Sequence, residues 1–229
     1  MLVGLPLIYT LLNATFNGLM WTTNIGGAIA HQRLRNNYDV LCLIPDGPLT
    51  VNWIISTEQL HYNKSLERSL GDVGVVTQIM SVIVVFLLIG VVSAPGPQVR
   101  LEILRMLIVV VSLVTLIIID YIQSVVTGSL IGMLIANLTR NVMDSRMWSF
   151  AVFLSVQFFI YVTLLLLLFL SPALAPGSET GVTLLELIMP VVVVLLIVGL
   201  REFIIFVLWR WLIQILNVEN SVGTIYQYH

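Results

Sequence analysis

The sequence predicts an all-α fold, a polytopic transmembrane helical bundle of about five spans plus interfacial helices. Three observations support this prediction. Hydrophobic residues make up 59% of the 229 residues and charged residues 10%, whereas soluble domains carry about 25% charged residues. The mean hydropathy is +1.03. Several charge-free windows reach the length of about 20 residues that a helix needs to cross a bilayer. We therefore expect residues 1–229 to form a single transmembrane domain in lipid.

The first two predicted spans cover residues 3–28 and 73–94. The first has no charge, but Asn13, Asn17 and Asn24 give it a polar face that is expected to meet protein. The second ends at Ala94-Pro-Gly-Pro, a run that cannot continue a helix. These two segments are therefore expected to cross the membrane.

The third predicted span, residues 106–138, is too long for a simple crossing. As one helix it would measure about 50 Å, so it must tilt, kink or protrude from the membrane. The fourth span is expected at residues 148–170 and the fifth at residues 184–200. After the fifth span, Arg210, Gln214 and Asn217 recur at helical spacing among tryptophans, which predicts an interfacial end.

Basic residues are distributed unevenly between the segments that join these spans. Two, Arg100 and Arg105, lie on one side, and eight lie on the other: Arg33, Arg35, Lys64, Arg68, Arg140, Arg146, Arg201 and Arg210. The positive-inside rule assigns the richer side to the cytoplasm. We therefore expect a multi-pass protein of the inner (cytoplasmic) cell membrane, with the N-terminus outside and the C-terminus in the cytoplasm.

Composition excludes two classes of protein. The net charge is −2 with a single lysine, Lys64, so there is no basic stripe for a nucleic acid. The single cysteine, Cys42, cannot form an intrachain disulfide. The expected surroundings are membrane lipid and other membrane-protein subunits.

Residues 30–72 form a polar segment between the first two spans, which is expected to be cytoplasmic and to act as an interaction element or a lid. Within it, residues 32–47 read QRLRNNYDVLCLIPDG. This run resembles the coupling segment of type-2 ATP-binding-cassette (ABC) exporter permeases, whose pattern is Glu-Arg-x-x-Gly-Thr-x-(Asp/Glu)-x-Leu followed by Pro-x-Ser. Arg33, Asp39, Leu41 and Pro45 keep the pattern, whereas Gln32 stands in place of the acid.

Further departures from the pattern accompany Gln32. Asn36-Asn37 stand where the family has Gly-Thr, and Gly47 stands where it has Ser. The resemblance starts at the family's second span, so the usual first span is expected to be missing.

The resemblance implies a permease that depends on a separate ATPase and works as a homodimer. The coupling segment, represented here by Gln32, Arg33, Asp39, Leu41 and Pro45, would contact that ATPase. The chain has no Gly-x-x-x-x-Gly-Lys-(Ser/Thr) motif, so we expect it not to be an enzyme itself. The alternative is a non-catalytic accessory subunit, derived from such a permease, in a larger photosynthetic or respiratory membrane complex.

Asp120 is the strongest candidate for an intramembrane site. A carboxylate inside a span is costly unless it is paired or hydrated, and Tyr121 and Gln123 make its surroundings polar. Asp120 is therefore expected to face protein or water. It is either a substrate or proton position or the partner of a structural pair, for which Arg201 is a candidate.

The remaining candidates receive structural interpretations. His31 follows a run of small residues, which would suit a haem or pigment ring. A haem held by two histidines needs both of them within spans, whereas His61 and His229 lie outside the spans. We expect no cofactor and no metal. Arg201 and Glu202 are interpreted as a mutual surface pair at the inner interface. Leu41, Leu43 and Ile44 are apolar on the aqueous side, so they should be covered by a partner or folded back.

Overall fold

The computed structural model describes residues 4–35, 37–43, 47–62, 64–174 and 184–216, and throughout these residues the regular structure is helical. The helices follow one another in the order α1 (Gly4–Leu34), α2 (Asn37–Leu41), α3 (Gly47–Tyr62), α4 (Lys64–Ser93), α5 (Pro97–Leu138), α6 (Val142–Leu174) and α7 (Leu184–Ile215).

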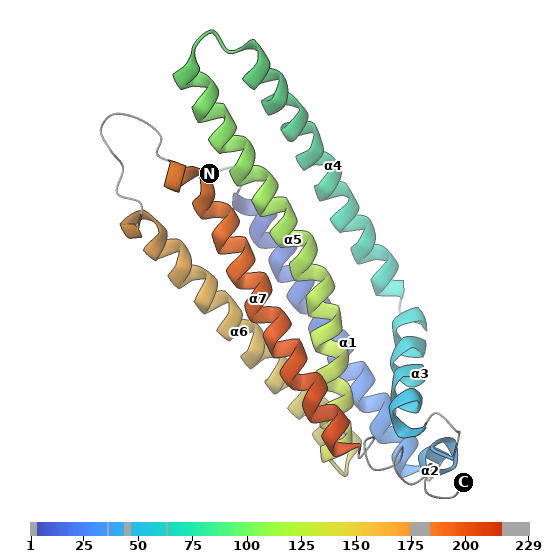
Figure 1. Ribbon diagram of the computed structural model, residues 1–229. Helices are drawn as coiled ribbons and strands as arrows, with labels where there is room; N and C mark the ends of the chain where they lie inside the picture. The colour runs from blue at the N-terminus through green and yellow to red at the C-terminus, as the bar shows by residue number, and fades with distance from the viewer. Residues whose placement is uncertain (1–3, 36, 44–46, 63, 175–183, 217–229) are drawn as a thin grey trace, which may run out of the picture.

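Helix α5 is the centre of the bundle. It packs against α1, α4, α6 and α7, as Figure 1 shows. The short helices α2 and α3 lie at the end of the bundle where α1 and α7 finish. The opposite end is formed by the α4–α5 hairpin, which extends beyond the ends of α6 and α7 (Figure 1). The helix that contains the overlong third span therefore extends past two of its neighbours in the bundle.

Three helices are long and apolar enough to cross a membrane: Pro97–Leu138, Val142–Leu167 and Leu187–Ile215. A shorter apolar stretch, Thr77–Ser93, lies in α4. These are fewer than the five spans expected. Helix α1 carries asparagine and threonine residues among its apolar ones, and the apolar stretch described in α4 is shorter than 18 residues.

One expected boundary is wrong. Helix α7 does not stop near Leu200 but continues without a break to Ile215, so Arg201 and Glu202 lie inside a candidate span and not at its edge. A charged residue does not by itself end a helix. Helix α4 begins at Lys64, before the expected span 73–94, and its apolar stretch Thr77–Ser93 lies within that span.

Small residues allow α1 to approach α5 closely. A methyl group added at Gly132 would lie 2.8 Å from the carbonyl oxygen of Thr22, and one added at Gly128 would lie 3.0 Å from that of Gly18. Backbones at such distances exclude any larger residue at these positions. This contact fixes the register of α1 on α5 and so positions the polar side chains described next.

Candidate intramembrane polar site

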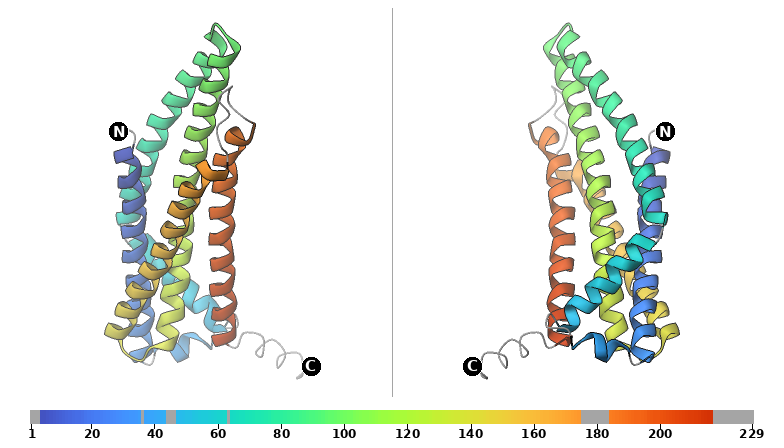
Figure 2. Two further views of the ribbon diagram at one scale, coloured as in Figure 1. Left: turned by 90° about the vertical axis from the view of Figure 1, so that its left-hand side faces the viewer. Right: turned by 90° about the vertical axis from the view of Figure 1, so that its right-hand side faces the viewer.

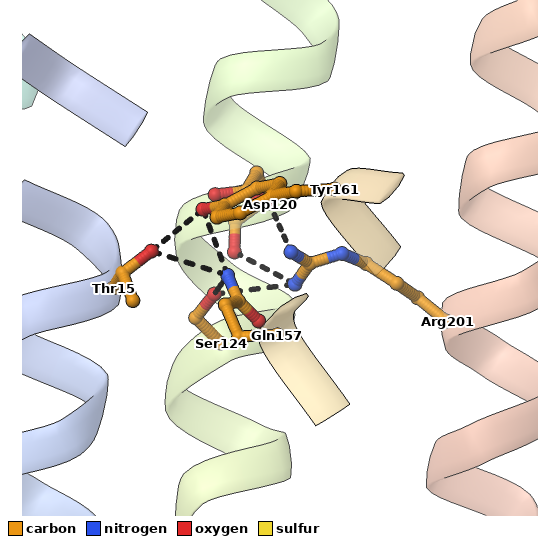
Figure 3. Close-up of polar contacts among 6 residues, drawn as sticks. All are labelled: Thr15, Asp120, Ser124, Gln157, Tyr161 and Arg201. Carbon is orange, nitrogen blue, oxygen red and sulfur yellow. Dashed lines mark hydrogen bonds and ion pairs between the residues drawn. The ribbon is translucent and has the colours of Figure 1, made fainter. Parts of the chain in front are cut away.

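Six polar side chains from four helices meet inside the bundle, as Figure 3 shows. We call them the polar cluster: Thr15 of α1, Asp120 and Ser124 of α5, Gln157 and Tyr161 of α6, and Arg201 of α7. Asp120 lies in the middle of α5, and Arg201 lies at the middle of the candidate span Leu187–Ile215. The cluster therefore occupies the level where lipid surrounds the bundle.

The centre of the cluster is a buried ion pair. Arg201 Nη2 donates to Asp120 Oδ1, and the two residues are 1% and 4% exposed. The pair joins α7 to α5. Asp120 therefore faces protein, as expected from the cost of placing a carboxylate in lipid.

The guanidinium is held by further bonds to α5. Arg201 Nη1 donates to Ser124 Oγ at 3.2 Å and to the backbone oxygen of Asp120 at 3.3 Å. Asp120 and Ser124 are one helical turn apart, so both lie on the face of α5 that contacts α7. Both terminal nitrogens of the Arg201 guanidinium therefore bond to α5.

Gln157 extends the network to α6 and α1. Its Nε2 donates to Tyr161 Oη at 2.9 Å and approaches Ser124 Oγ at 3.3 Å and Thr15 Oγ1 at 3.4 Å. The Thr15 hydroxyl and the Tyr161 hydroxyl are 2.6 Å apart. The cluster therefore links the four helices of the bundle through polar contacts.

Charge in the cluster is balanced. The carboxylate of Asp120 and the guanidinium of Arg201 neutralise each other, and the other four members are uncharged. Asp120 Oδ2 and Arg201 Nε are buried without a hydrogen-bond partner among the described residues. The arrangement can fix the helices and hold a water molecule, whereas a charged ligand would have to displace one partner of the ion pair.

Gln123 and Tyr121, the two neighbours predicted to share the site, lie on different faces of α5. Gln123 Nε2 donates to Glu202 Oε1 on α7 at 2.8 Å. Tyr121 packs edge-on against Trp21 of α1, with ring centroids 6.1 Å apart. The structure therefore brings Asp120 and Gln123 to α7 but directs Tyr121 to α1.

The expected surface pair of Arg201 and Glu202 is wrong. Adjacent residues in a helix point in directions about 100° apart, so Arg201 enters the bundle while Glu202 remains exposed. Thr15, Gln157 and Tyr161 were not among the predicted site residues. The spacing of one turn between Gln157 and Tyr161 in an apolar helix is the signal that would have indicated them.

Residues 30–72, which we call the coupling-like segment, contact the bundle through Arg33. Its Nη1 donates to the backbone oxygen of Ala136 at 2.8 Å, and its guanidinium lies 5.8 Å from the centroid of the Tyr38 ring. Ala136 is in the last turn of α5, whose carbonyls have no partner within the helix. Arg33 therefore closes the end of α5 from α1.

Tyr38 holds α2 against α3. Its hydroxyl donates to Asn52 Oδ1 at 3.0 Å. Burial raises the pKa of this hydroxyl well above its ordinary value, and the neighbouring Cys42 raises it further. Tyr38 is therefore a neutral donor at physiological pH.

The structure describes the side chains of some of the other residues predicted for coupling. Gln32 is half-buried and Leu41 is exposed, while Leu43 is 82% exposed. Leu41 and Leu43 are therefore not folded back onto the chain. The side chain of Asp39, and Ile44 and Pro45 altogether, lie outside what the structure describes.

A second link joins the coupling-like segment to α7. Trp53 of α3 and Trp209 of α7 have ring centroids 6.1 Å apart. Trp209 is about two turns along α7 from Arg201. Helix α3 therefore contacts the helix that carries the cation of the polar cluster.

The cofactor candidate His31 is exposed in the last turn of α1. Among the described residues, no group of three His, Cys, Asp or Glu side chains is placed to hold a metal ion. No family model, no curated protein and no solved structure matches the chain. The polar cluster and the coupling-like segment are therefore the features of the chain that bear on its function.

Proposed function

We propose that the chain is a permease-like integral membrane subunit, resembling the transmembrane component of a type-2 ABC exporter and dependent on a separate ATPase. The observation that carries this proposal is an exposed apolar patch at the α2 end of the bundle. We call Leu34, Val40, Leu41 and Leu43 the α2 patch; all four are exposed. An apolar patch outside the spans indicates a protein partner.

The α2 patch is connected to the bundle in a way that suits a coupling element. Arg33 joins this end of α1 to the last turn of α5, and Trp53 joins α3 to α7. A displacement of α2 and α3 by a partner would therefore act on α1, α5 and α7. Those helices, together with α6, hold the polar cluster.

The proposed topology has five spans, with α1 and α4 counted beside α5, α6 and α7. The packing of α1 along α5 supports its inclusion, and the apolar stretch of α4 supports the fifth. Arginines with described side chains gather at the α2 end, and Arg100 and Arg105 lie near the opposite end. Those at the α2 end are Arg33, Arg35, Arg140, Arg146 and Arg210. The α2 end would then be cytoplasmic.

Nucleotide-dependent cross-linking tests the ATPase dependence. In a Cys42→Ser background, a cysteine placed at Leu43 would carry a photo-activated cross-linker in native membranes. We expect an adduct with a co-purifying ATPase whose yield changes between the ATP-bound and nucleotide-free states. The matched control is a cysteine at Val92, which is equally exposed at the opposite end. Adducts with other subunits, unaffected by nucleotide, would contradict the proposal.

An accessory subunit of a larger membrane complex is the second candidate. It is favoured by the balanced charge of the polar cluster, because Asp120 and Arg201 are satisfied by each other and leave no charge for a substrate. In that case the cluster serves assembly. Cross-links from Leu43 to electron-transfer or pigment-binding subunits would support this candidate.

A further inference from the structure

Glu202 presents a carboxylate on the outer surface of the bundle at mid-membrane level. It is exposed at the middle of the candidate span Leu187–Ile215, and its Oε1 accepts a hydrogen bond from Gln123 Nε2 at 2.8 Å. Acidic side chains inside spans are rare and almost always face protein or a water-filled cavity. A lipid-facing Glu202 would violate that rule, so a missing neighbour is indicated.

The charges at this level do not balance. Asp120 and Glu202 are both acidic, and Arg201 is the cation that lies between α5 and α7. Arg201 pairs with Asp120, and no cation among the described residues pairs with Glu202. One negative charge is therefore uncompensated, and Gln123 supplies a single neutral donor.

The surface around Glu202 has the form of a helix-packing face. Six exposed residues recur at helical spacing along one side of α7. We call them the Glu202 face: Ile188, Val192, Leu195, Gly199, Glu202 and Phe206. A Cβ added at Gly199 would have no atom within 4 Å, so there is a depression one turn from Glu202. A glycine at such a position lets another helix approach closely.

Helix α7 is available for such a contact. It packs against α5 and α6 and stands at one side of the bundle, as both views in Figure 2 show. The members of the Glu202 face are exposed while Arg201, Leu208 and Leu212 are buried, and Glu202 lies at the edge of the face, where Gln123 of α5 donates to it. The opposite side of α7 is thus already used.

We infer that the Glu202 face docks a transmembrane helix of a partner subunit that carries a lysine or arginine at the depth of Glu202. Charge complementarity selects this occupant, since a basic side chain would neutralise the carboxylate that Arg201 leaves unpaired. A second copy docked through the same face would bring no cation, because none of the six residues of the face is basic. This interaction is separate from the ATPase contact proposed at α2.

A synthetic helix provides the test. The full chain is reconstituted in phosphatidylcholine vesicles with a leucine-rich peptide of about 24 residues that has one central lysine. The matched peptide has leucine at that place. Energy transfer between labels on the chain and the peptide measures association. We expect the lysine peptide to bind about tenfold more tightly than the leucine peptide, the size of an interhelical polar contact in lipid.

Variants of the face make the test specific. Glu202→Gln keeps an acceptor for Gln123 but removes the charge, and should remove most of the preference for the lysine peptide. Gly199→Leu adds a bulky side chain at a position where an added Cβ has no atom within 4 Å, and should weaken binding of the lysine peptide. Phe158→Leu, at an exposed position of α6, is the control that should change nothing.

Three results would overturn the inference. Equal binding of the two peptides would show that the face is covered by lipid. An unchanged preference for the lysine peptide in Glu202→Gln would show that the lysine does not interact with the charge of Glu202. Self-association of the labelled chain through this face, lost in Gly199→Leu, would identify a second copy as the occupant.

Discussion

The two halves of α5 are equally helical but differ in their surroundings. The buried residues of α5 all lie between Ile117 and Ala136, and none lies in residues 97–116. The second half is enclosed by α1, α6 and α7, whereas the first half has α4 as its main neighbour (Figures 1 and 2). One continuous helix therefore passes from a protein interior to an exposed hairpin.

Small residues and the position of the polar ones distinguish the two halves. The exposed half has its charged residues, Arg100, Glu102 and Arg105, near its start and mainly large aliphatic residues after them. The buried half contains Gly128 and Gly132 and a series of polar residues: Asp120, Gln123, Ser124, Thr127 and Ser129. In lipid, large aliphatic side chains gain nothing from burial, so helices associate through close backbone approach and polar contacts. Small and polar residues thus indicate protein-facing surfaces.

Among the variants that test this difference between the two halves of α5, removing one partner of the ion pair should lower the free energy of unfolding most. Arg201→Leu leaves the carboxylate of Asp120 buried without its cation, and a broken buried pair costs about 3–5 kcal/mol. We expect a fall of that size in the free energy of unfolding, measured by SDS titration in mixed micelles. Helices α5 and α7 should separate first.

The double variant Asp120→Leu/Arg201→Leu is the control. It removes both charges, and replacing a buried pair by apolar residues is often close to neutral. Its stability should therefore lie much nearer to wild type than that of Arg201→Leu. Equal losses in the single and double variants would show that shape, and not charge, makes this position sensitive.

The second prediction compares Gly132, in the buried half of α5, with Gly90 of α4, which contacts the exposed half. Gly132→Ala places a methyl group 2.8 Å from the Thr22 carbonyl oxygen, and overpacking against a backbone costs about 1–3 kcal/mol. Gly90→Ala in α4 meets Ile103 at 3.6 Å, an ordinary contact. We expect Gly132→Ala to lower the free energy of unfolding and Gly90→Ala to leave it unchanged or slightly raised. Similar losses at both sites would contradict the proposed difference between the halves.

Much of the fold follows from local signals in the sequence. The Ala94-Pro-Gly-Pro run predicted the turn before α5, which begins at Pro97. The buried position of Asp120 followed from the cost of a charge in lipid. These features depend on one helix at a time.

For Asp120 the sequence left two alternatives open, a structural pair with Arg201 and a substrate or proton position, and the structure shows the pair. The choice between them depends on how α5 and α7 are aligned, and no spacing within one helix contains that information. The fifth span was ended at Leu200 because Arg201 and Glu202 carry charge. A charge that is neutralised inside the bundle does not end a span. The boundary at Leu200 is therefore too early, because the charge of Arg201 belongs to the ion pair.

The smallest predicted effect concerns the far end of the buried half, where Arg33 and Tyr38 continue the packing beyond α5. Tyr38→Phe removes the donor to Asn52 Oδ1 and should cost about 1 kcal/mol, since a buried acceptor is left without a partner. Burial raises the pKa of Tyr38 in the folded state, so its contribution to stability is complete below the ordinary tyrosine pKa of about 10 and is lost as the pH rises above it. The difference in unfolding free energy between wild type and Tyr38→Phe should therefore be constant from about pH 7 to 9 and shrink above about pH 10. If this difference is unchanged at the higher pH, the packing of α2 on α3 does not enclose Tyr38, and the enclosed region ends with α5.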